Sequence, residues 1–207
     1  MSIGDAEIKT QERVIRFFKD PEILGYQYIG NLSDYQNKNI KEDRLRQYLR
    51  LKGYADKLID AAVMQLQQEA GNLSRGVYDA NKTVYSRLKY GIPVSESPEK
   101  PPVTVELIDE ANPLNNDFAI AEEVTVVEQQ EKRPDLVIYL NGIAVAVIEL
   151  KRSSISVSEG IRQNLTNQKN SFIQGFFSTM QFCMAGNESE GLRYGTLLTG
   201  EKFYMEW

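Results

Sequence analysis

The segment PDLVIYLNGIAVAVIELK, from Pro134 to Lys151, contributes most to the prediction of the fold. It holds two apolar runs with strand character, residues 135–140 and 143–150. They are joined by Asn-Gly, a dipeptide typical of a tight β-hairpin turn. The charged residues of the segment are Asp135, Glu149 and Lys151. Burying carboxylates between apolar strands is costly unless they are paired or bind a cation, so these three residues are candidates for chemistry.

The geometry of the turn decides whether the two acids can act together. With a plain two-residue turn at Asn141-Gly142, Asp135 and Glu149 would point to opposite faces of the hairpin. With a three-residue loop over 140–142, in which the glycine has positive φ and forms a bulge, the two acids share one face with Lys151. If the two acids form one site, we therefore expect the bulged turn.

Outward from the hairpin, the chain divides by hydrophobic period. Residues 1–91 show mainly helical spacing, and residues 92–102 hold four prolines, which predicts a linker or edge loop. From residue 103 the period changes to two, with one helical segment at 157–170 that follows a capping-box pattern at Ser156. The expected strands of this part are 103–108, 118–127 (one strand or a pair), 135–140, 143–150, 180–185, 192–198 and 202–207. The prediction is an α/β chain in which a helical region, 1–91, packs on a core formed by 103–207.

Composition excludes several classes of protein. The 207 residues are 42% hydrophobic, which suffices for a sizeable core, and the net charge is -5. Because there is no histidine, serine and cysteine triads and histidine-ligated metals are excluded. The single cysteine excludes an intrachain disulfide and a cysteine-cluster zinc site, and it fits a reducing cytoplasm. We expect no membrane span, because the apolar runs are only strand-sized, and no secretory signal, because the N-terminus lacks that pattern.

Charge is distributed unevenly along the chain. Residues 38–89 carry 11 basic and 6 acidic side chains, whereas residues 101–135 carry 2 basic and 9 acidic ones. The basic stretch fits either a solvated helix face or a surface that contacts phosphates.

Two acids and a lysine suit the hydrolysis of a phosphodiester. Two carboxylates can hold a hard divalent cation, which lowers the pKa of a bound water, and a lysine can orient that water or offset the charge that develops on phosphate. A structural interpretation also stands. In it, Asp135 only begins a strand, and Glu149 and Lys151 are strand-end residues in contact with solvent.

The same residues resemble a known nuclease motif. Pro134-Asp135 followed by Glu149-Leu150-Lys151 resembles the PD-(D/E)xK pattern. More specifically, residues 105–207 resemble the N-terminal nuclease domain of the R (motor) subunit of type I restriction enzymes. The resemblance rests on an Asn-Asp-Phe segment within 107–128, on the Asn-Gly hairpin, and on a glutamine-containing helix at 159–168.

The resemblance implies a restriction-endonuclease-like fold, a mixed β-sheet flanked by helices. Asp135 and Glu149 would bind Mg²⁺, and Lys151 would be the catalytic lysine. The substrate would be double-stranded DNA, cleaved away from the recognition site after ATP-driven translocation. The partners would be the specificity and methylation subunits of a cytoplasmic restriction complex.

The resemblance also implies roles for three further residues, whose match to the family motifs is less complete. Gln163 matches the glutamine of the Gln-x-x-x-Tyr motif of the family and would contact DNA or steady the site. The tyrosine of that motif is replaced by Asn167, four residues further along the same helix face. An early helix adds an acid to the site in some members, and Glu12 is the candidate here, with a capping or surface role as its alternative.

Two other interpretations remain open at the level of sequence. The chain could be a different PD-(D/E)xK nuclease, of repair or recombination, or a non-catalytic module that docks DNA or another subunit. Residues 195–202, GTLLTGEK, approach a phosphate-binding loop, but Glu201 stands in the lysine position and no Ser or Thr follows Lys202. We therefore expect a turn there, and we expect that the ATP-dependent motor implied by the family lies outside this chain.

Overall fold

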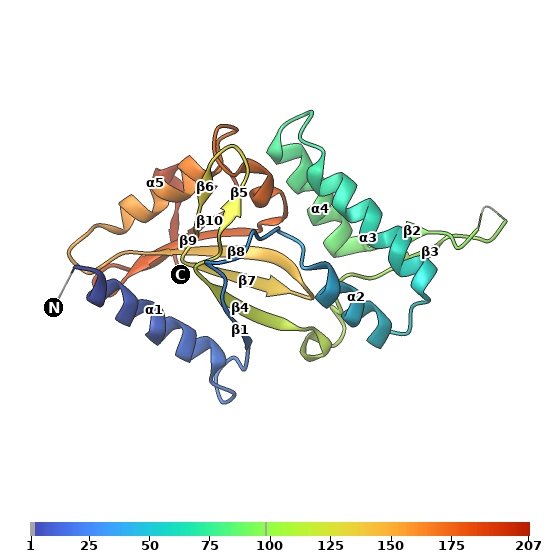
Figure 1. The fold of residues 1–207 in the computed structure, drawn as a ribbon, viewed down its shortest axis with the longest axis horizontal. Helices are drawn as coiled ribbons and strands as arrows, with labels where there is room; N and C mark the ends of the chain where they lie inside the picture. Colours follow the sequence, from blue (N-terminus) through green and yellow to red (C-terminus); the bar gives the residue numbers. More distant parts are fainter. Residues whose placement is uncertain (1–2, 98) are drawn as a thin grey trace.

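The computed structural model describes residues 3–97 and 99–207, and its centre is a mixed seven-stranded sheet (Figure 1). The strands lie in the order β1-β4-β7-β8-β9-β10-β11. Their bounds are β1 Gln27–Asn31, β4 Phe118–Glu122, β7 Leu136–Leu140, β8 Ile143–Leu150, β9 Phe182–Asn187, β10 Gly191–Gly195 and β11 Met205–Glu206. The predicted fold class, a mixed sheet flanked by helices, is confirmed.

Strand β8 occupies the middle of the sheet. It pairs antiparallel with β7 on one side and parallel with β9 on the other. The parallel connection runs through helix α5, Val157–Asn167. Seven of the eight residues of β8 are buried, as expected for a strand with neighbours on both edges and protein on both faces.

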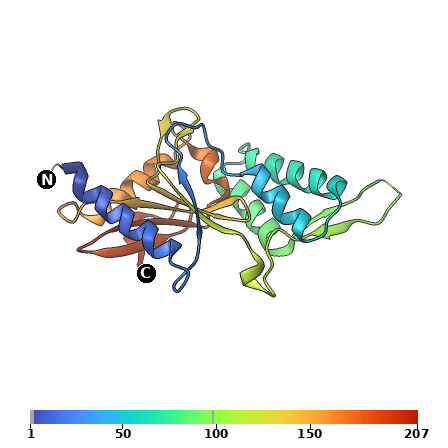
Figure 2. The same cartoon turned by 60° about the horizontal axis from the view of Figure 1, so that its bottom comes forward.

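Helices α1 (Ile3–Lys19) and α5 lie on opposite sides of the sheet. In Figure 1, α5 is above the sheet and α1 is below it, and Figure 2 shows α1 crossing in front of the strands. From α1, Ile15 packs with Ile120 and Leu136 of the sheet. From α5, Val157 and Ile161 pack with residues that include Ala185 of β9.

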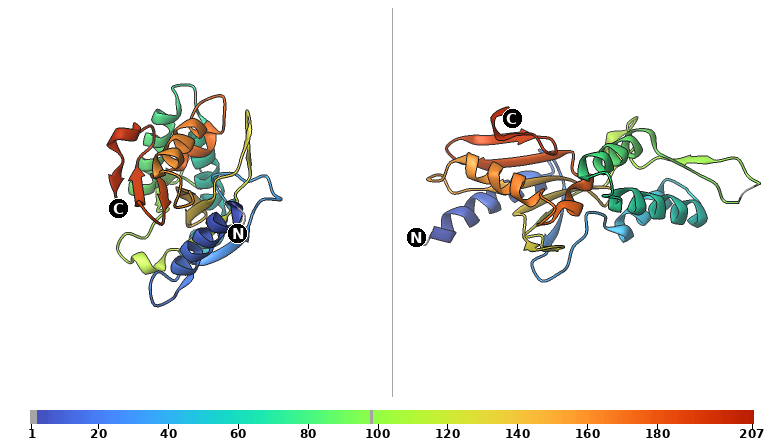
Figure 3. Two further views of the ribbon diagram at one scale, coloured as in Figure 1. Left: turned by 90° about the vertical axis from the view of Figure 1, so that its left-hand side faces the viewer. Right: turned by 90° about the horizontal axis from the view of Figure 1, so that it is seen from above.

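A second apolar core lies beyond one end of the sheet, where three helices and a short hairpin extend away from it (Figure 3, right). The helices are α2 Glu42–Leu51, α3 Asp56–Gly71 and α4 Val77–Tyr90, and the hairpin pairs β2 Ile92–Val94 with β3 Val103–Val105. Ile143, the first residue of β8, belongs to this core as well, so the helical part is attached directly to the strand that carries Glu149.

Two expectations about the first half of the chain are wrong at the level of elements. Residues 27–31 are not helical but form β1, which pairs in parallel with β4 at the edge of the main sheet. The proline-rich stretch 92–102 is not all loop, because its first three residues form β2. Packing therefore does not follow the expected boundaries, since α1 and β1 join the sheet whereas β2 and β3 pack on α3.

Several short elements complete the structure near the C-terminal half of the chain. A small hairpin pairs β5 (Val126–Val127) with β6 (Glu131–Lys132). Three 3₁₀ turns are η1 Pro113–Asn115, η2 Gln174–Thr179 and η3 Glu201–Phe203. The last expected strand, 202–207, is reduced to β11 because η3 precedes it. Of the helices in the part of the chain that the structure describes, none is both long and apolar enough to cross a membrane.

The turn between β7 and β8 differs from the expected bulged loop. Leu140 pairs with Ile143, so the turn has two residues, Asn141 and Gly142, and both have positive φ, 52° and 81°. The side chain of Asn141 is fully buried and holds the turn in place. It donates to the Leu107 carbonyl at 2.8 Å and accepts from the Asp117 amide at 2.7 Å.

The extra residue of the hairpin is Val145. Tyr139 pairs with Ala144 but Ile138 pairs with Ala146, so Val145 is left without a partner on β7 and forms a β-bulge. Beyond the bulge, Leu136 pairs with Ile148, and the register places Asp135 opposite Glu149. The predicted positive φ of Gly142 and the common face of the two acids are both observed, but the bulge lies within β8 and not in the turn.

Candidate active site

The direction of the Glu149 side chain follows from the alternation of side chains between the two faces of β8. Its neighbours Ile148 and Leu150 line an apolar groove on one face of the sheet, so Glu149 points to the other face, beneath α5. The side chain is completely buried. A glutamate in this position is unusual, because ionised carboxylates almost never lie fully buried without a counter-charge.

Asp135 comes directly before β7, and its carboxylate extends across to the end of β8. Its Oδ2 atom accepts a hydrogen bond of 2.6 Å from the backbone amide of Leu150. This contact fixes the Asp135 carboxylate beside the residue that follows Glu149. Two carboxylates from neighbouring strands are thereby held against each other.

The electrostatics of Glu149 reflect this crowding. Burial raises the pKa of Glu149 well above its ordinary value, the negative charge of Asp135 raises it further, and the positive charge of Lys151 partly opposes both effects. Its Oε2 atom accepts a hydrogen bond of 2.7 Å from Gln163 of α5. Within residues 3–97 and 99–207, no N–H or hydroxyl group donates to the buried Oε1 atom. The Asp135 carboxyl can hydrogen-bond Glu149 only while one of the two acids is protonated, which also raises the pKa of Glu149.

A glycine allows α5 to come close to Glu149. A Cβ atom at Gly160 would lie 3.0 Å from the side chain of Ala185 and 3.6 Å from the Cβ of Glu149. The absence of that side chain lets the helix lie directly on β8 and β9, and it brings Gln163, one turn further on, to the carboxylate. Sequence reasoning missed Gly160, because a single glycine in a helix does not show what packs against it.

Lys151 completes the group of charged residues at the end of β8. Its backbone amide donates to the Gly186 carbonyl at 2.9 Å, which continues the pairing with β9. Its ammonium donates to the Leu150 carbonyl at 3.1 Å and lowers the pKa of Glu149 by its charge. The structure thus brings Asp135, Glu149 and Lys151 together.

The donor set fits Mg²⁺ better than a structural metal. In the described part of the chain, no three or more Asp, Glu or Cys side chains gather as metal ligands, so a cation here would have two carboxylates from the protein. Mg²⁺ is commonly held by one or two carboxylates, with water and substrate phosphate as the remaining ligands. The buried Oε1 atom of Glu149, next to a second carboxylate, is the observation that fits a cation best.

Gln163 and Asn167 lie on the same side of α5, as predicted from their spacing. Both line a cleft of about 420 Å³ that also includes Lys151. Gln163 contacts Glu149 and is therefore placed to orient it. Asn167, which replaces the tyrosine of the family motif, is almost fully buried in the cleft wall.

The same cleft is rich in cations. The other residues that line it are Lys132, Arg133, Glu159, Arg162 and Thr166. Arg133 pairs with Glu123 at 2.8 Å, and Arg162 pairs with Glu201 at 2.8 Å. Lys132, Arg133, Lys151 and Arg162 line this cleft together with one acid, Glu159, which also pairs with Arg162 at 2.8 Å. The cleft therefore offers cations to a phosphate although the whole chain carries net charge -5.

Glu123 is a second residue that sequence reasoning missed. It lies just after β4 with φ of 51°, an uncommon value for a side chain other than glycine, and its amide donates to the Asp135 carbonyl at 2.8 Å. Its charge also raises the pKa of Glu149. The residue predicted for this part of the site, Glu12, has an exposed side chain on α1. Its neighbour Gln11 is buried and donates to Glu123 at 3.2 Å.

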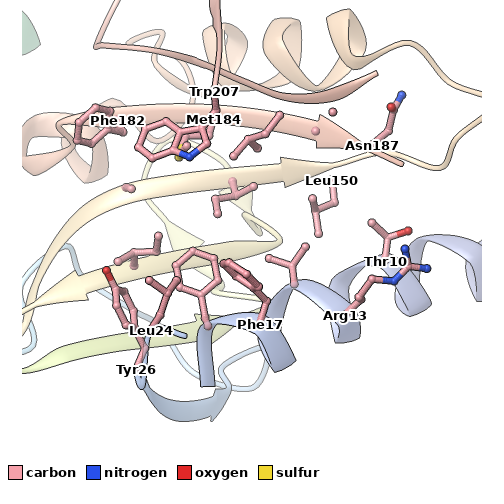
Figure 4. A pocket seen from close by; sticks show the side chains of 18 of the residues that line it. Thr10, Arg13, Phe17, Leu24, Tyr26, Leu150, Phe182, Met184, Asn187 and Trp207 are labelled. Atoms are coloured by element: carbon pink, nitrogen blue, oxygen red, sulfur yellow. The ribbon is translucent and has the colours of Figure 1, made fainter. Parts of the chain in front are cut away.

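A larger cavity than this cleft lies elsewhere. A groove of about 790 Å³ runs between α1 and the face of the sheet opposite to Glu149. Figure 4 shows Phe17 and Leu24 on one side of it and Phe182, Met184 and Trp207 on the other. Its walls are almost entirely apolar, with Arg13 and Asn187 at one end, so it lacks the paired acids that the chemistry requires.

The fold and the paired acids define the class, an α/β protein with a nuclease-like sheet and a candidate metal site at the end of its central strand. Comparison with known families then identifies the chain more closely. Residues 7–203 match the family described as the type I restriction enzyme R protein N terminus, and the chain belongs to this family. It is similar to a putative type I restriction enzyme MjaIXP endonuclease subunit from Methanocaldococcus jannaschii, with 32% identity over 96 residues. That match covers 42% of this chain and 9% of the relative.

Proposed function

We propose that this chain is the part of a type I restriction enzyme R subunit that cleaves DNA, by Mg²⁺-dependent hydrolysis of a phosphodiester. One observation carries the proposal. Glu149 is fully buried, its Oε1 atom has no N–H or hydroxyl donor among the described residues, and Asp135 and Lys151 lie beside it. A buried, unsatisfied carboxylate next to a second carboxylate destabilises a fold, so a role in binding a cation accounts for it better than a structural role does.

In this proposal each side chain has a separate task. Asp135 and Glu149 would supply carboxylate oxygens to the metal, and Gln163 holds Glu149 in position through Oε2. The bound Mg²⁺ would lower the pKa of a water molecule and neutralise charge on the phosphate. Lys151 stabilises the negative charge that develops as the water oxygen bonds to phosphorus and the ester bond breaks.

The cleft beside the site supplies the place for the DNA strand. Lys132 of β6, Arg133 directly after it, Lys151 and Arg162 of α5 all line the cleft. These cations can bind the phosphates on either side of the one that is cleaved. Contacts to phosphate carry no sequence information, which suits an enzyme whose recognition site is read elsewhere.

The activity of the whole subunit is part of the proposal. ATP-driven translocation by motor domains, the specificity and methylation subunits as partners, and a cytoplasmic location follow from the family. In this chain the stretch 195–202, which approaches a phosphate-binding pattern, begins at the last residue of β10 and ends within the turn η3, and residue 201 is glutamate. We therefore assign ATP binding to the motor domains of the complete subunit.

The test is DNA cleavage by the complete R subunit assembled with its partners. Asp135→Asn, Glu149→Gln and Lys151→Ala should each reduce cleavage by at least about a hundredfold, whereas ATP hydrolysis and translocation stay near wild type. Lys57→Ala, an exposed lysine on α3, is the control for loss of a positive charge. Glu12→Gln in the same assay tests the acid predicted on α1, because unchanged cleavage removes it from the site. Cleavage at the wild-type rate in the Glu149 variant would reject the proposal and favour a non-catalytic docking module.

A further inference from the structure

Helix α4 carries an exposed row of alternating tyrosine and lysine residues. The row consists of Tyr78, Lys82, Tyr85 and Lys89 and is called the α4 stripe below. Their spacing of four, three and four residues places them on one side of the helix. All four are exposed, with 59% of Tyr78 and 50% of Tyr85 accessible.

The stripe is not needed to hold α4 in the fold. The helix packs through a different side, formed by Val77, Ala80, Val84 and Leu88, all of which are buried. The acid of this helix, Asp79, lies outside the stripe and pairs with Arg75 at 3.2 Å. The stripe therefore presents positive charge and aromatic rings to solvent, which points to a partner with negative charge.

The position of the stripe relates it to the cleft of the candidate active site. Asn81 of α4 donates to the carbonyls of Ser178 and Met180, at 3.1 and 2.7 Å, so this side of α4 rests on η2 and the residue after it. Tyr78 and Tyr85 are the helical neighbours of Asn81, three residues before it and four after it, so the stripe runs along the flank of α4 next to η2.

The segment that includes η2 leads back to α5, whose last turns line the cleft. Lys169, which lies in the chain between α5 and η2, is exposed. In Figure 1, α5 lies above the sheet, and α4 lies beyond the end of the sheet. Helix α4 packs against η2, which follows α5 in the chain. Cations thus lie on the α4 stripe, at Lys169 in the connection between α5 and η2, and in the cleft that α5 lines.

We propose that duplex DNA flanking the cleaved phosphodiester docks on the α4 stripe. The two lysines are seven residues apart, about 10 Å along the helix, which corresponds to about three base-pair steps of duplex. Lysine neutralises phosphates, and tyrosine hydroxyls donate hydrogen bonds to phosphate oxygens. This inference rests on the proposed function, because it takes DNA as the substrate, and it adds a second contact region outside the catalytic cleft.

The experiment measures binding of a 30-base-pair duplex by fluorescence anisotropy, without divalent metal, at several salt concentrations from 50 mM upward. Lys82→Ala combined with Lys89→Ala should weaken binding at least about tenfold near 100 mM salt. It should also reduce the slope of log affinity against log salt by about two, because each lysine neutralises one phosphate. The matched control is Lys19→Ala combined with Lys57→Ala, which removes the same charge from exposed positions on α1 and α3.

Several results would overturn the proposal. They are wild-type affinity and slope in the Lys82 and Lys89 variant, an equal loss in the control, and no measurable binding by the unaltered chain at 50 mM salt. The last result, together with selective capture of an acidic protein of the restriction complex, would assign the stripe to a protein partner. Because the assay contains no metal, it does not depend on cleavage. Failure of DNA docking is therefore distinguishable from failure of the catalytic proposal, which the Glu149→Gln cleavage assay reports.

Discussion

Glu149 is the residue at which stability and function conflict most clearly. Its carboxylate is buried, its Oε1 atom has no N–H or hydroxyl donor in the described structure, and a second carboxylate lies close by. Each of these features lowers the stability of the fold when Glu149 is ionised. A divalent cation would outweigh the repulsion between the two acids, because both would be attracted to the same positive charge.

The raised pKa of Glu149 predicts a pH-dependent stability in the absence of metal. Below the ordinary pKa of 4.5 the carboxyl is protonated in both the folded and the unfolded chain. As pH rises above that value the unfolded chain ionises first, so Glu149 lowers the free energy of unfolding until the folded carboxyl has ionised as well. Glu149→Gln should therefore raise the melting temperature at pH 8 by at least about 2–4 °C, roughly 1 kcal/mol or more, and should have a much smaller effect at pH 4.

Thermal unfolding in a metal-free buffer at both pH values measures this effect. Glu12→Gln makes the same chemical change at an exposed position and serves as the control. If the Glu149 variant were less stable than wild type at pH 8, the buried carboxylate would be satisfied by contacts of the fold, and its assignment as a strained metal ligand would be wrong.

At the residue scale, the sequence identified those candidate site residues that interrupt an apolar pattern or match a family motif. Asp135, Glu149 and Lys151 could be found because charges within buried strands are conspicuous, and Gln163 because it matches a family motif. Gly160 and Glu123 could not be found in this way. Their importance depends on a close helix–strand contact and on an unusual backbone angle, and neither leaves a pattern in neighbouring residues.

At the scale of elements, the β7–β8 hairpin shows why two different geometries can give the same face. The expected three-residue turn and the observed bulge at Val145 each add one residue to the hairpin, so both keep Asp135 and Glu149 on one side. The choice between them depends on contacts outside the hairpin. The Val145 carbonyl accepts from the Gln181 amide at 2.7 Å, and the Gly142 carbonyl accepts from the Lys41 amide at 2.7 Å.

The turn makes a prediction about stability at this scale. Gly142 has φ of 81°, and a Cβ atom there would lie 2.6 Å from the Lys41 carbonyl oxygen and 2.8 Å from the Leu45 amide, both backbone atoms. Gly142→Ala should lower the free energy of unfolding by about 3 kcal/mol or more, because backbone strain and a steric clash add. Gly53 has a similar φ of 85° but open space around it, so Gly53→Ala should lower it by only about 1 kcal/mol.

Urea unfolding of the two variants compares strain alone with strain plus clash. Equal losses of stability would show that the close approach of α2 to the turn does not constrain the turn.

The same comparison explains a limit of sequence analysis. Asn-Gly predicts a turn correctly, but the neighbouring helix that requires glycine at Gly142 comes from a segment about a hundred residues earlier.

Strand β1 was missed for a related reason. Its five residues, Gln27–Asn31, show little apolar alternation and lie between helical segments, so local pattern favours no strand. Its pairing partner, β4, is about ninety residues away. A short edge strand of this kind is defined by the sheet that it joins and not by its own composition.

At the scale of the whole molecule, the net charge is acidic but the surfaces proposed to bind DNA are basic. The chain carries net charge -5, yet the cleft beside the candidate site and the α4 stripe are both basic. The match to the Methanocaldococcus jannaschii subunit spans 9% of that protein. A domain that is acidic overall, with local basic surfaces, suits a nuclease to which other parts of an assembly deliver DNA.

The central claim is that Asp135 and Glu149 hold a divalent metal, and calorimetric titration of the metal-free chain with Mg²⁺ and Mn²⁺ tests it most directly. Wild type should bind one or more ions, and Glu149→Gln and Asp135→Asn should each weaken binding at least about tenfold. Lys151→Ala should bind at least as tightly as wild type, because it removes a positive charge beside the site, although the proposed function predicts that it loses cleavage. Binding that is absent from wild type, or unchanged in the Glu149 variant, would contradict the assignment of this site.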